Sequence, residues 1–433
     1  MTTPVTNSTR DSVDACSCED FSVTRRSLLK SGAVLGGGMA VTQMFGEAMM
    51  QSSFAGTTGG NTMVVISLRG GIDGLGVVVP HGDAGYATNR PNTKVATSEL
   101  LCKDAMFGLH PKMAALQPLW NAGELAAIQA VGLSVANRSH FSAIEAVEDA
   151  APGTSIRTGW VNRMIGQANP GTHSTFDAVQ LGMNFPTAAL TGDSPILATS
   201  DLKNLQVSGL SSDYTNQRYG SLATAWAGAG GPLASGANEA VSISKGAGKT
   251  LSTMADTSAS YPSIWNASPF SDPLKQAAKM IRADLGTDVI AIDAGSWDLH
   301  TNYGTTAWGG MQSSIEGLSQ SLAAFFNDLG SRRSKVTVVT ISEFGRRVAE
   351  NGSQGFDHGW GNMMLVAGAG VRGGQYYGSW PGLGPSQIAD GDLKVTTDYR
   401  TVLGEVITKR FPNRSLATTF PGFSYSSPLG FMS

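Results

Sequence analysis

Cysteine is scarce in this chain, and two of its three cysteines, Cys16 and Cys18, lie near the amino terminus. Beyond residue 55 only Cys102 remains, so the main part of the chain has no internal disulfide available. A surplus of one charge is also lacking. Residues 1–55 hold four basic and five acidic groups, which leaves 26 Lys and Arg against 28 Asp and Glu, a net charge of −2. This balance gives no basic footprint for nucleic acid or for an anionic membrane surface.

The chain has little that resembles a membrane span. Its amino-terminal apolar run, from Gly32 to about Phe45, is short and rich in glycine. A twin-arginine motif, Thr24–Lys30, precedes this run, and small residues at 53–55 offer a cleavage site. We therefore expect residues 1–55 to be a signal peptide with an amino-terminal extension, recognised by the twin-arginine export machinery. The expected location is periplasmic, cell-envelope or extracellular, with no membrane span after cleavage; an uncleaved anchor is the alternative.

Three apolar, β-branched runs end in residues that can hold a metal ion. The runs are typical of buried strands, and a segment with helical spacing, Met311–Leu329, connects the second run to the third. A strand–helix–strand unit makes its strands parallel, so their carboxyl ends lie on one side. Carboxylates and imidazoles there could bind Zn, Mn, Fe, Mg or Ca. The candidate ligands are Asp73, Asp298, His300, Glu343 and His358.

Several of these candidates have a structural alternative. Asp73 could close a glycine-rich turn through its side chain, and Glu343 could form a buried ion pair with a nearby arginine. Asp357 and His358 could be two ligands, or one ligand with a carboxylate that orients it. The pair Asp298 and His300 is the most specific, because two ligand types alternate at strand spacing.

A fourth apolar run, Leu125–Val131, is followed by Ser139 and His140 at the start of a predicted helix. A helix amino terminus suits an anion such as phosphate. Ser139 could be a nucleophile activated by a metal, or an ordinary helix N-cap. His140 could be a ligand, a residue that orients a ligand, or a packed imidazole. The arginines that could bind an oxyanion are Arg69, Arg138 and Arg346, with surface ion pairs as the alternative.

The predicted fold class is α/β, with a largely parallel central sheet and helices on both faces. Residues 206–261 are dominated by Gly, Ala, Ser and Thr, so we interpret them as an insertion or a cap within a single domain over residues 56–433. Near the end of the chain, Asp398 is the predicted N-cap of a helix that extends to Arg410.

The DUF1501 family of exported bacterial proteins resembles this chain in a set of ordered motifs. Behind the twin-arginine signal these motifs are LRGGIDGL, NRSHF, SWDLH, SEFGRRVAENGS, DHGWGN and GSWPGL. The family is similar to the alkaline phosphatase and sulfatase superfamily, whose members hold two divalent metals at the carboxyl edge of a largely parallel sheet. The resemblance implies an alkaline phosphatase-like domain with two divalent ions. It also implies Ser139 as nucleophile, with Asp73, Asp298, His300, Glu343 and His358 as ligands.

The chain departs from the superfamily pattern at two points. Glu343-Phe344 stands where an Asp-His dipeptide is usual, and the sulfatase signature of Cys or Ser followed by Pro and Arg is absent. The second departure disfavours an arylsulfatase. We expect an exported metal-dependent hydrolase of a phosphate ester or related oxyanion ester, either small or carried on a polymer. The alternative is a non-catalytic exported binding or assembly protein on a degenerate hydrolase scaffold, because fold does not fix function.

Overall fold

The computed structural model describes residues 49–50, 59–168, 174–206, 215–255, 257–264 and 267–433. All of them belong to one unit, Val41–Ser433. The twin-arginine motif, the apolar run behind it and the predicted cleavage site lie outside the described residues. One short strand, β1 (Met49–Met50), falls within the segment predicted to be removed, and it pairs with β7 (Leu197–Thr199). Cleavage and export stay predictions.

A mixed, mostly parallel sheet forms the centre of the described residues. Its strand order is β1-β7-β6-β8-β2-β9-β10-β5-β11, with β12 beside β5. Strands β7, β6, β8, β2 and β9 are mutually parallel, whereas β10 is antiparallel to both β9 and β5. The remaining strands of this sheet are β2 (Thr62–Ser67), β5 (Leu125–Gly132), β6 (Ala178–Leu181), β8 (Val289–Asp293), β9 (Val336–Ile341), β10 (Asn362–Gly368), β11 (Tyr376–Tyr377) and β12 (Thr397–Asp398).

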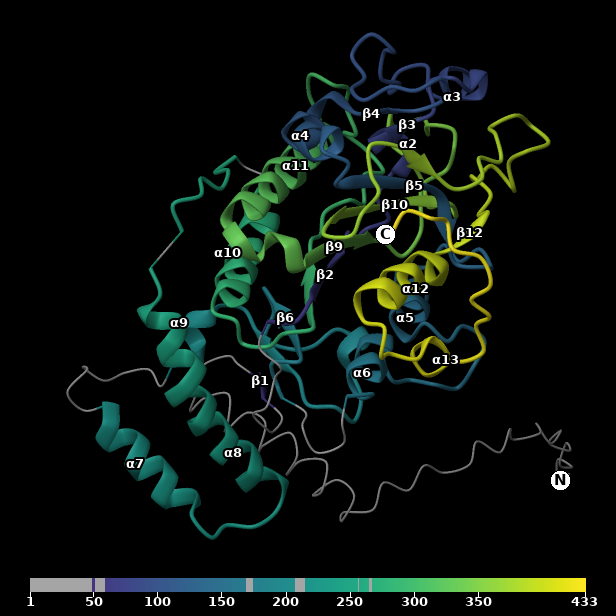
Figure 1. The fold of residues 1–433 in the computed structure, drawn as a ribbon. Helices are drawn as coiled ribbons and strands as arrows, with labels where there is room; N and C mark the ends of the chain where they lie inside the picture. Colours follow the sequence, from purple (N-terminus) through teal and green to yellow (C-terminus); the bar gives the residue numbers. More distant parts are fainter. Residues whose placement is uncertain (1–48, 51–58, 169–173, 207–214, 256, 265–266) are drawn as a thin grey trace, which may run out of the picture. The chain divides into compact units, whose positions relative to one another are not determined.

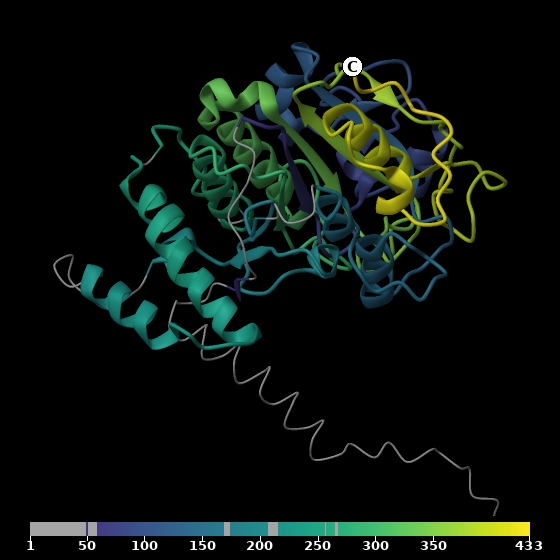
Figure 2. The same ribbon diagram turned by 60° about the horizontal axis from the view of Figure 1, so that its bottom comes forward.

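Helices cover both faces of this sheet (Figures 1 and 2). Successive residues of a strand point to opposite faces. On β2, Val64 and Ile66 therefore join the cluster that contains α10 (Ser268–Arg282) and α11 (Gly310–Asp328). Met63 and Val65 join the cluster that contains α5, α6 and α12. The predicted α/β fold class, with a largely parallel sheet and two helical layers, is confirmed.

The helices of the second layer are α5 (His140–Asp149), α6 (Trp160–Ile165), α12 (Tyr399–Arg410) and α13 (Leu416–Thr419). The predicted N-cap of α12 is confirmed, since the Asp398 carboxylate accepts a hydrogen bond from the backbone N–H of Arg400 at 2.9 Å. Helix α11 connects β8 to β9 as the spacing of its apolar residues predicts, and Gly330 follows it with a φ of +55°.

The segment rich in small residues is largely helical. It contains α7 (Thr215–Trp226), α8 (Pro232–Ile243), a π-helical turn η5 (Ser244–Gly248) and α9 (Lys249–Thr253). This segment contacts other parts of the chain: η5 contacts η3 (Leu202–Leu205), and α8 contacts β1. Its function as an insertion or a cap stays a prediction.

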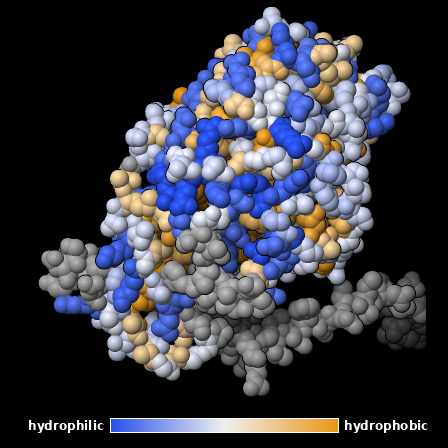
Figure 3. Space-filling view, viewed as in Figure 1, coloured by the Kyte–Doolittle hydropathy of each residue, from blue (hydrophilic) through white to orange (hydrophobic). Residues whose placement is uncertain are grey.

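Shorter elements complete the described chain. They are α2 (Gly74–Val77), β3 (Val78–Val79), α3 (Ala84–Asn89), β4 (Gly108–Leu109), η1 (Pro111–Leu116), α4 (Gln117–Asn121), η2 (Ala188–Leu190) and η6 (Gly330–Lys335). Within the described parts, no helix combines the length and the apolar character needed to cross a bilayer. On the face that Figure 3 shows, hydrophilic residues are interspersed with small apolar areas.

Candidate metal centre

The candidate site lies where four loops meet at one edge of the central sheet. Strands β2, β8, β9 and β5 run in one direction and β10 runs in the other. The segments after the first four strands and the segment before β10 therefore lie at the same edge, where ligands bind in open α/β sheets. These segments carry the predicted residues Arg69, Asp73, Arg138, Ser139, His140, Asp298, His300, Glu343, Arg346, Asp357 and His358.

Glycine permits the close approach of these loops. Gly70, after β2, has a φ of +107°, and a Cβ atom on it would lie 2.7 Å from the backbone nitrogen of Asp298. Gly71 has a φ of +61°, and a Cβ there would lie 2.5 Å from the Phe344 ring. Side chains are disfavoured at such φ values, so both the limited space and the backbone conformation favour glycine at these two positions.

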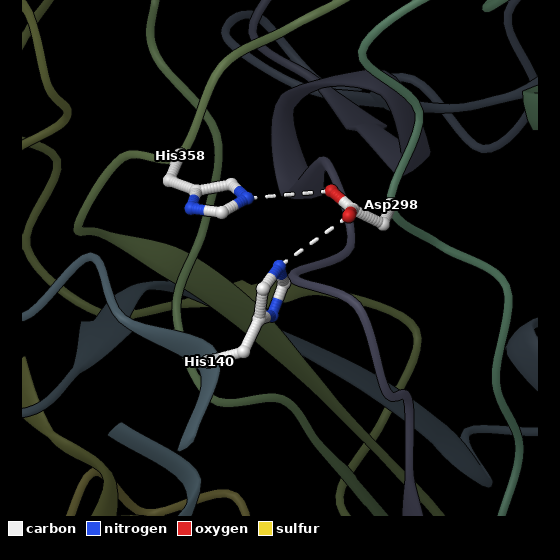
Figure 4. A group of neighbouring side chains, drawn as sticks. All are labelled: His140, Asp298 and His358. Atoms are coloured by element: carbon white, nitrogen blue, oxygen red, sulfur yellow. Dashed lines mark hydrogen bonds and ion pairs between the residues drawn. The ribbon is translucent and has the colours of Figure 1, made fainter. Parts of the chain in front are cut away.

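His140, Asp298 and His358 form a group that could hold a metal ion (Figure 4). One ligand atom from each residue lies within 4.8 Å of the others. The two carboxylate oxygens of Asp298 face different imidazoles: Nε2 of His140 lies 3.5 Å from Oδ2, and Nε2 of His358 lies 3.4 Å from Oδ1. The Asp298 side chain is 45% exposed, so the group is open to solvent.

Glu343 orients His140 rather than joining this group. Its Oε1 atom lies 2.8 Å from Nδ1 of His140 and also accepts a hydrogen bond from the Gly70 backbone N–H at 2.8 Å. A carboxylate at Nδ1 places the ring proton there and leaves Nε2 as a lone-pair donor. Nε2 of His140 is buried and has no hydrogen-bond partner. An orphaned buried nitrogen beside a carboxylate fits a metal ligand.

A backbone contact fixes the tautomer of His358. Its Nδ1 atom lies 2.8 Å from the carbonyl oxygen of Arg138, so the ring proton is on Nδ1 and Nε2 faces Asp298 as a lone pair. The loop is held by a short antiparallel contact in which Gly359 donates to the Gly345 carbonyl at 2.8 Å. Burial, followed by the charges of Arg346 and His140, holds the pKa of His358 below its usual value, which favours the neutral, ligating form.

His300 lies against the same group. Its Nε2 atom is 3.0 Å from Oδ1 of Asp298 and 3.0 Å from Nε2 of His358, while its Nδ1 atom is 3.0 Å from Oδ1 of Asp357. Asp357 is therefore the orienting carboxylate of the sequence prediction, although it orients His300 and not its neighbour His358. Hydrogen bonds from His300 and Asn351 lower the pKa of Asp357, which keeps it ionised.

Arg346 is a buried partner of Asp298. Its guanidinium donates to Oδ1 of Asp298, and it also donates to the carbonyls of Gly71 at 2.6 Å and Phe356 at 2.8 Å. Its side chain is 1% exposed. Partial burial raises the pKa of Asp298, but the hydrogen bond and charge of Arg346, with smaller contributions from His300 and His140, outweigh it and hold that pKa below its usual value.

The structure does not bring Asp73 into this group. Both of its carboxylate oxygens accept hydrogen bonds from the buried Arg90, at 2.6 and 3.0 Å, and the Tyr303 hydroxyl donates to one of them at 2.6 Å. An aspartate satisfied in this way fits a structural ion pair. We therefore leave Asp73 out of the ligand set proposed below.

Arg69 and Arg138 are likewise paired with carboxylates. Arg69 donates to Asp293 at 2.8 Å and to Glu148 at 2.5 Å. Arg138 donates to Asp392 at 2.6 Å and to Asp390 at 2.9 Å. These contacts correspond to the ion-pair alternative of the sequence prediction, and we do not assign either arginine to an oxyanion.

Ser139 occupies the N-cap position of α5, directly before His140. The position agrees with the N-cap alternative, but the hydroxyl makes no capping hydrogen bond. The backbone N–H of Ser139 donates to the Asn137 side chain at 3.0 Å, and the residue is exposed. The hydroxyl is therefore available to a ligand at the start of this helix.

The sequence interpretation missed several residues that shape the site. Arg90 and Tyr303 hold Asp73, and Asn351 donates to the His300 carbonyl at 3.0 Å and to Asp357 at 3.2 Å. Arg90 and Tyr303 lie outside the quoted motifs. Asn351 lies within SEFGRRVAENGS, so the motif itself was a signal that could have identified it.

The family model named "Protein of unknown function (DUF1501)" matches residues 61–407. The chain belongs to the DUF1501 family. This match covers the sheet from β2 to β12 and every residue of the candidate site. No curated protein is similar to the chain in sequence.

Several solved structures have low similarity to this DUF1501 protein. Among them, the lipoteichoic acid synthase LtaP from Listeria monocytogenes has 10% identity and a TM-score of 0.32, and the match covers 83% of this chain and 80% of that one. An alkaline phosphatase superfamily protein from Vibrio parahaemolyticus has 10% identity and a TM-score of 0.35, with coverages of 80% and 70%. The PsFucS1 sulfatase from Pseudoalteromonas sp. has 11% identity and a TM-score of 0.32, with coverages of 80% and 68%.

Proposed function

We propose that this DUF1501 protein is an exported, metal-dependent hydrolase of a phosphate ester or related oxyanion ester. The observation that carries the proposal is the group of His140, Asp298 and His358, in which the buried Nε2 atom of His140 has no hydrogen-bond partner. Export is supported by the twin-arginine motif, which lies outside the described residues.

The residues of the group are suited to a divalent cation. Glu343 and the Arg138 carbonyl hold the ring protons of His140 and His358 on Nδ1, so both Nε2 atoms are free to coordinate. When bound, a divalent cation supplies Lewis acidity towards an ester oxygen. Arg346 keeps Asp298 ionised and fixed in position.

The start of α5 supplies the rest of the proposed site. The first backbone N–H groups of a helix have no partners within the helix and create positive potential, so they suit an anionic ester. Ser139 precedes the ligand His140 at this terminus, and its hydroxyl is free of a capping bond. We propose Ser139 as the nucleophile. Its oxygen would bond to phosphorus while the ester P–O bond breaks, and the hydroxyl proton would go to the leaving alcohol. Water would then hydrolyse the phosphoserine and release phosphate.

Hydrolysis of a panel of aryl phosphates, measured with the metal content of the same samples, tests this function. We expect turnover by the metal-loaded protein, and loss of turnover in Ser139→Ala with unchanged metal content. Ser142→Ala is the matched control, because Ser142 is an exposed serine on the same helix whose hydroxyl bonds Asn137 at 3.1 Å. Failure to bind any divalent metal would overturn the proposal, and metal binding without turnover of any ester would favour the non-catalytic alternative.

A further inference from the structure

We propose that the centre takes one metal ion, held by four donors, and that the guanidinium of Arg346 is its fixed second positive charge. The four donors are His140, His300, His358 and Asp298. This inference rests on the metal group of the proposed function, but not on hydrolysis itself. It departs from the two-ion arrangement that the sequence resemblance implies.

The spacing of the donor atoms matches a single ion. Two ligands that are each about 2.1 Å from an ion are about 3.0 Å apart at a right angle and about 3.4 Å apart at the tetrahedral angle. Oδ1 of Asp298 lies 3.0 Å from Nε2 of His300 and 3.4 Å from Nε2 of His358, and Oδ2 lies 3.5 Å from Nε2 of His140. Nε2 of His300 and Nε2 of His358 are 3.0 Å apart.

The orientation of the imidazoles also fits a shared cation. Asp357, the Arg138 carbonyl and Glu343 occupy the Nδ1 side of His300, His358 and His140, respectively. This arrangement leaves the Nε2 atom of each ring facing Asp298. Nε2 of His300 lies 3.0 Å from Nε2 of His358 and 3.4 Å from the Arg346 guanidinium. We therefore place His300 as the fourth donor, beside the group of the other three residues.

Two buried arginines oppose a second ion. Arg346 donates to Oδ1 of Asp298, so a further cation beside that oxygen would meet a guanidinium that stays charged at any ordinary pH. Asp73 is one of the carboxylates that the sequence resemblance assigns to the metals, and Arg90 neutralises it through two hydrogen bonds. Among the described residues, one group of metal-ligand spacing is present, made of His140, Asp298 and His358.

The donor set also determines the class of metal. Three imidazoles and one carboxylate suit Zn, Fe, Ni or Cu, whereas Mg and Ca prefer an all-oxygen environment. We therefore expect the centre to bind zinc or cobalt in the presence of excess magnesium. Of the ions that the sequence left open (Zn, Mn, Fe, Mg and Ca), this donor set therefore favours Zn and Fe over Mg and Ca.

Titration of the metal-free full chain with cobalt(II), followed by visible absorption, tests the inference. Cobalt absorbs much more strongly in a four-coordinate site than in an octahedral one, so the spectrum reports on the ligand set without any activity. We expect one cobalt ion per chain, a strong visible band, and no displacement by magnesium. His300→Ala should weaken binding by roughly 10- to 100-fold and lose the strong band.

Two further variants separate ligation from folding. Asp357→Asn keeps His300 but weakens its orientation, so we expect a smaller loss of affinity, roughly tenfold. His81→Ala is the matched control, since the His81 ring contacts the Asp104 carbonyl at 3.1 Å and lies outside the group. Circular dichroism confirms that each variant is folded.

The outcomes distinguish this inference from the proposed function. Two cobalt ions per chain, or unchanged binding by a folded His300→Ala variant, would overturn the one-ion, four-donor centre. Binding of one ion with the expected spectrum but no ester hydrolysis would overturn the proposed function alone. A chain that binds no cobalt would overturn both.

Discussion

Oε1 of Glu343 lies 2.8 Å from Nδ1 of His140, although 203 positions separate the two residues in the chain. Glu343 lies near the start of the loop that follows β9, and His140 is the first residue of α5, so this contact connects two sides of the site. The motifs suggest Glu343 as a metal ligand, whereas this contact makes it the residue that orients His140. The glutamate holds the proton of the imidazole, and the imidazole offers its other nitrogen to the metal group.

Glu343→Gln should weaken zinc binding by roughly 10- to 100-fold, because the amide carries no charge to hold the His140 ring proton on Nδ1. Calorimetric zinc titration measures the affinity. Glu405→Gln is the control, since Glu405 is also buried but accepts hydrogen bonds from the backbone N–H groups of Leu429 and Met432. Equal zinc affinity in the two variants would contradict the orienting role of Glu343.

Asp73→Asn should lower the free energy of unfolding by about 3–5 kcal/mol and leave the metal content unchanged. The reason is that the buried Arg90 loses its charged partner, which is costly in a protein interior. Urea unfolding and metal analysis of the same preparation measure both quantities. A variant that keeps its stability but loses the ion would show that Asp73 is a ligand after all.

Glu148 should make the stability of the protein depend on pH. Burial, opposed by the charge of Arg69, raises the pKa of Glu148 from 4.5 to about 7. The folded protein therefore binds this proton more tightly than the unfolded chain does. The contribution of protonated Glu148 to the free energy of unfolding is complete below pH 4.5 and is lost as the pH rises towards 7.

Comparison of the wild type with Glu148→Gln isolates this effect. Across that pH range the wild type should lose up to about 3 kcal/mol relative to the variant, since each pKa unit corresponds to about 1.4 kcal/mol. Urea unfolding at pH 5 and at pH 8 gives the difference in unfolding free energy between the wild type and the variant at each pH. A pH-independent difference between the two proteins would show that the Glu148 carboxyl titrates alike in the folded and unfolded states.

Much of the fold could be predicted because local patterns determine it. The apolar runs became β2, β8, β9 and β5, and the helix-spaced segment between β8 and β9 became α11. A crossover helix makes its strands parallel, so the shared edge of Asp298, His300 and Glu343 followed from the connection between β8 and β9. The N-cap of α12 was predictable because it is a local feature: the Asp398 carboxylate accepts a hydrogen bond from the N–H of Arg400, two residues further along the chain.

The division of roles within the site could not be predicted in this way. Whether Asp73 binds a metal or a guanidinium depends on Arg90, the C-cap residue of α3, which lies outside the motifs that point to the site. The tautomer of His358 depends on a carbonyl 220 residues away in the chain. Such contacts arise from packing of distant loops, and the motifs alone contain no signal for them.

A crystal structure of the zinc-loaded protein, with anomalous diffraction at the zinc edge, tests the metal centre most directly. We predict one anomalous peak per chain, about 2.0–2.2 Å from a carboxylate oxygen of Asp298 and from the Nε2 atoms of the three donor histidines, His140, His300 and His358. The absence of a peak in this group, or a peak held by other residues, would contradict the metal centre on which the proposed function depends.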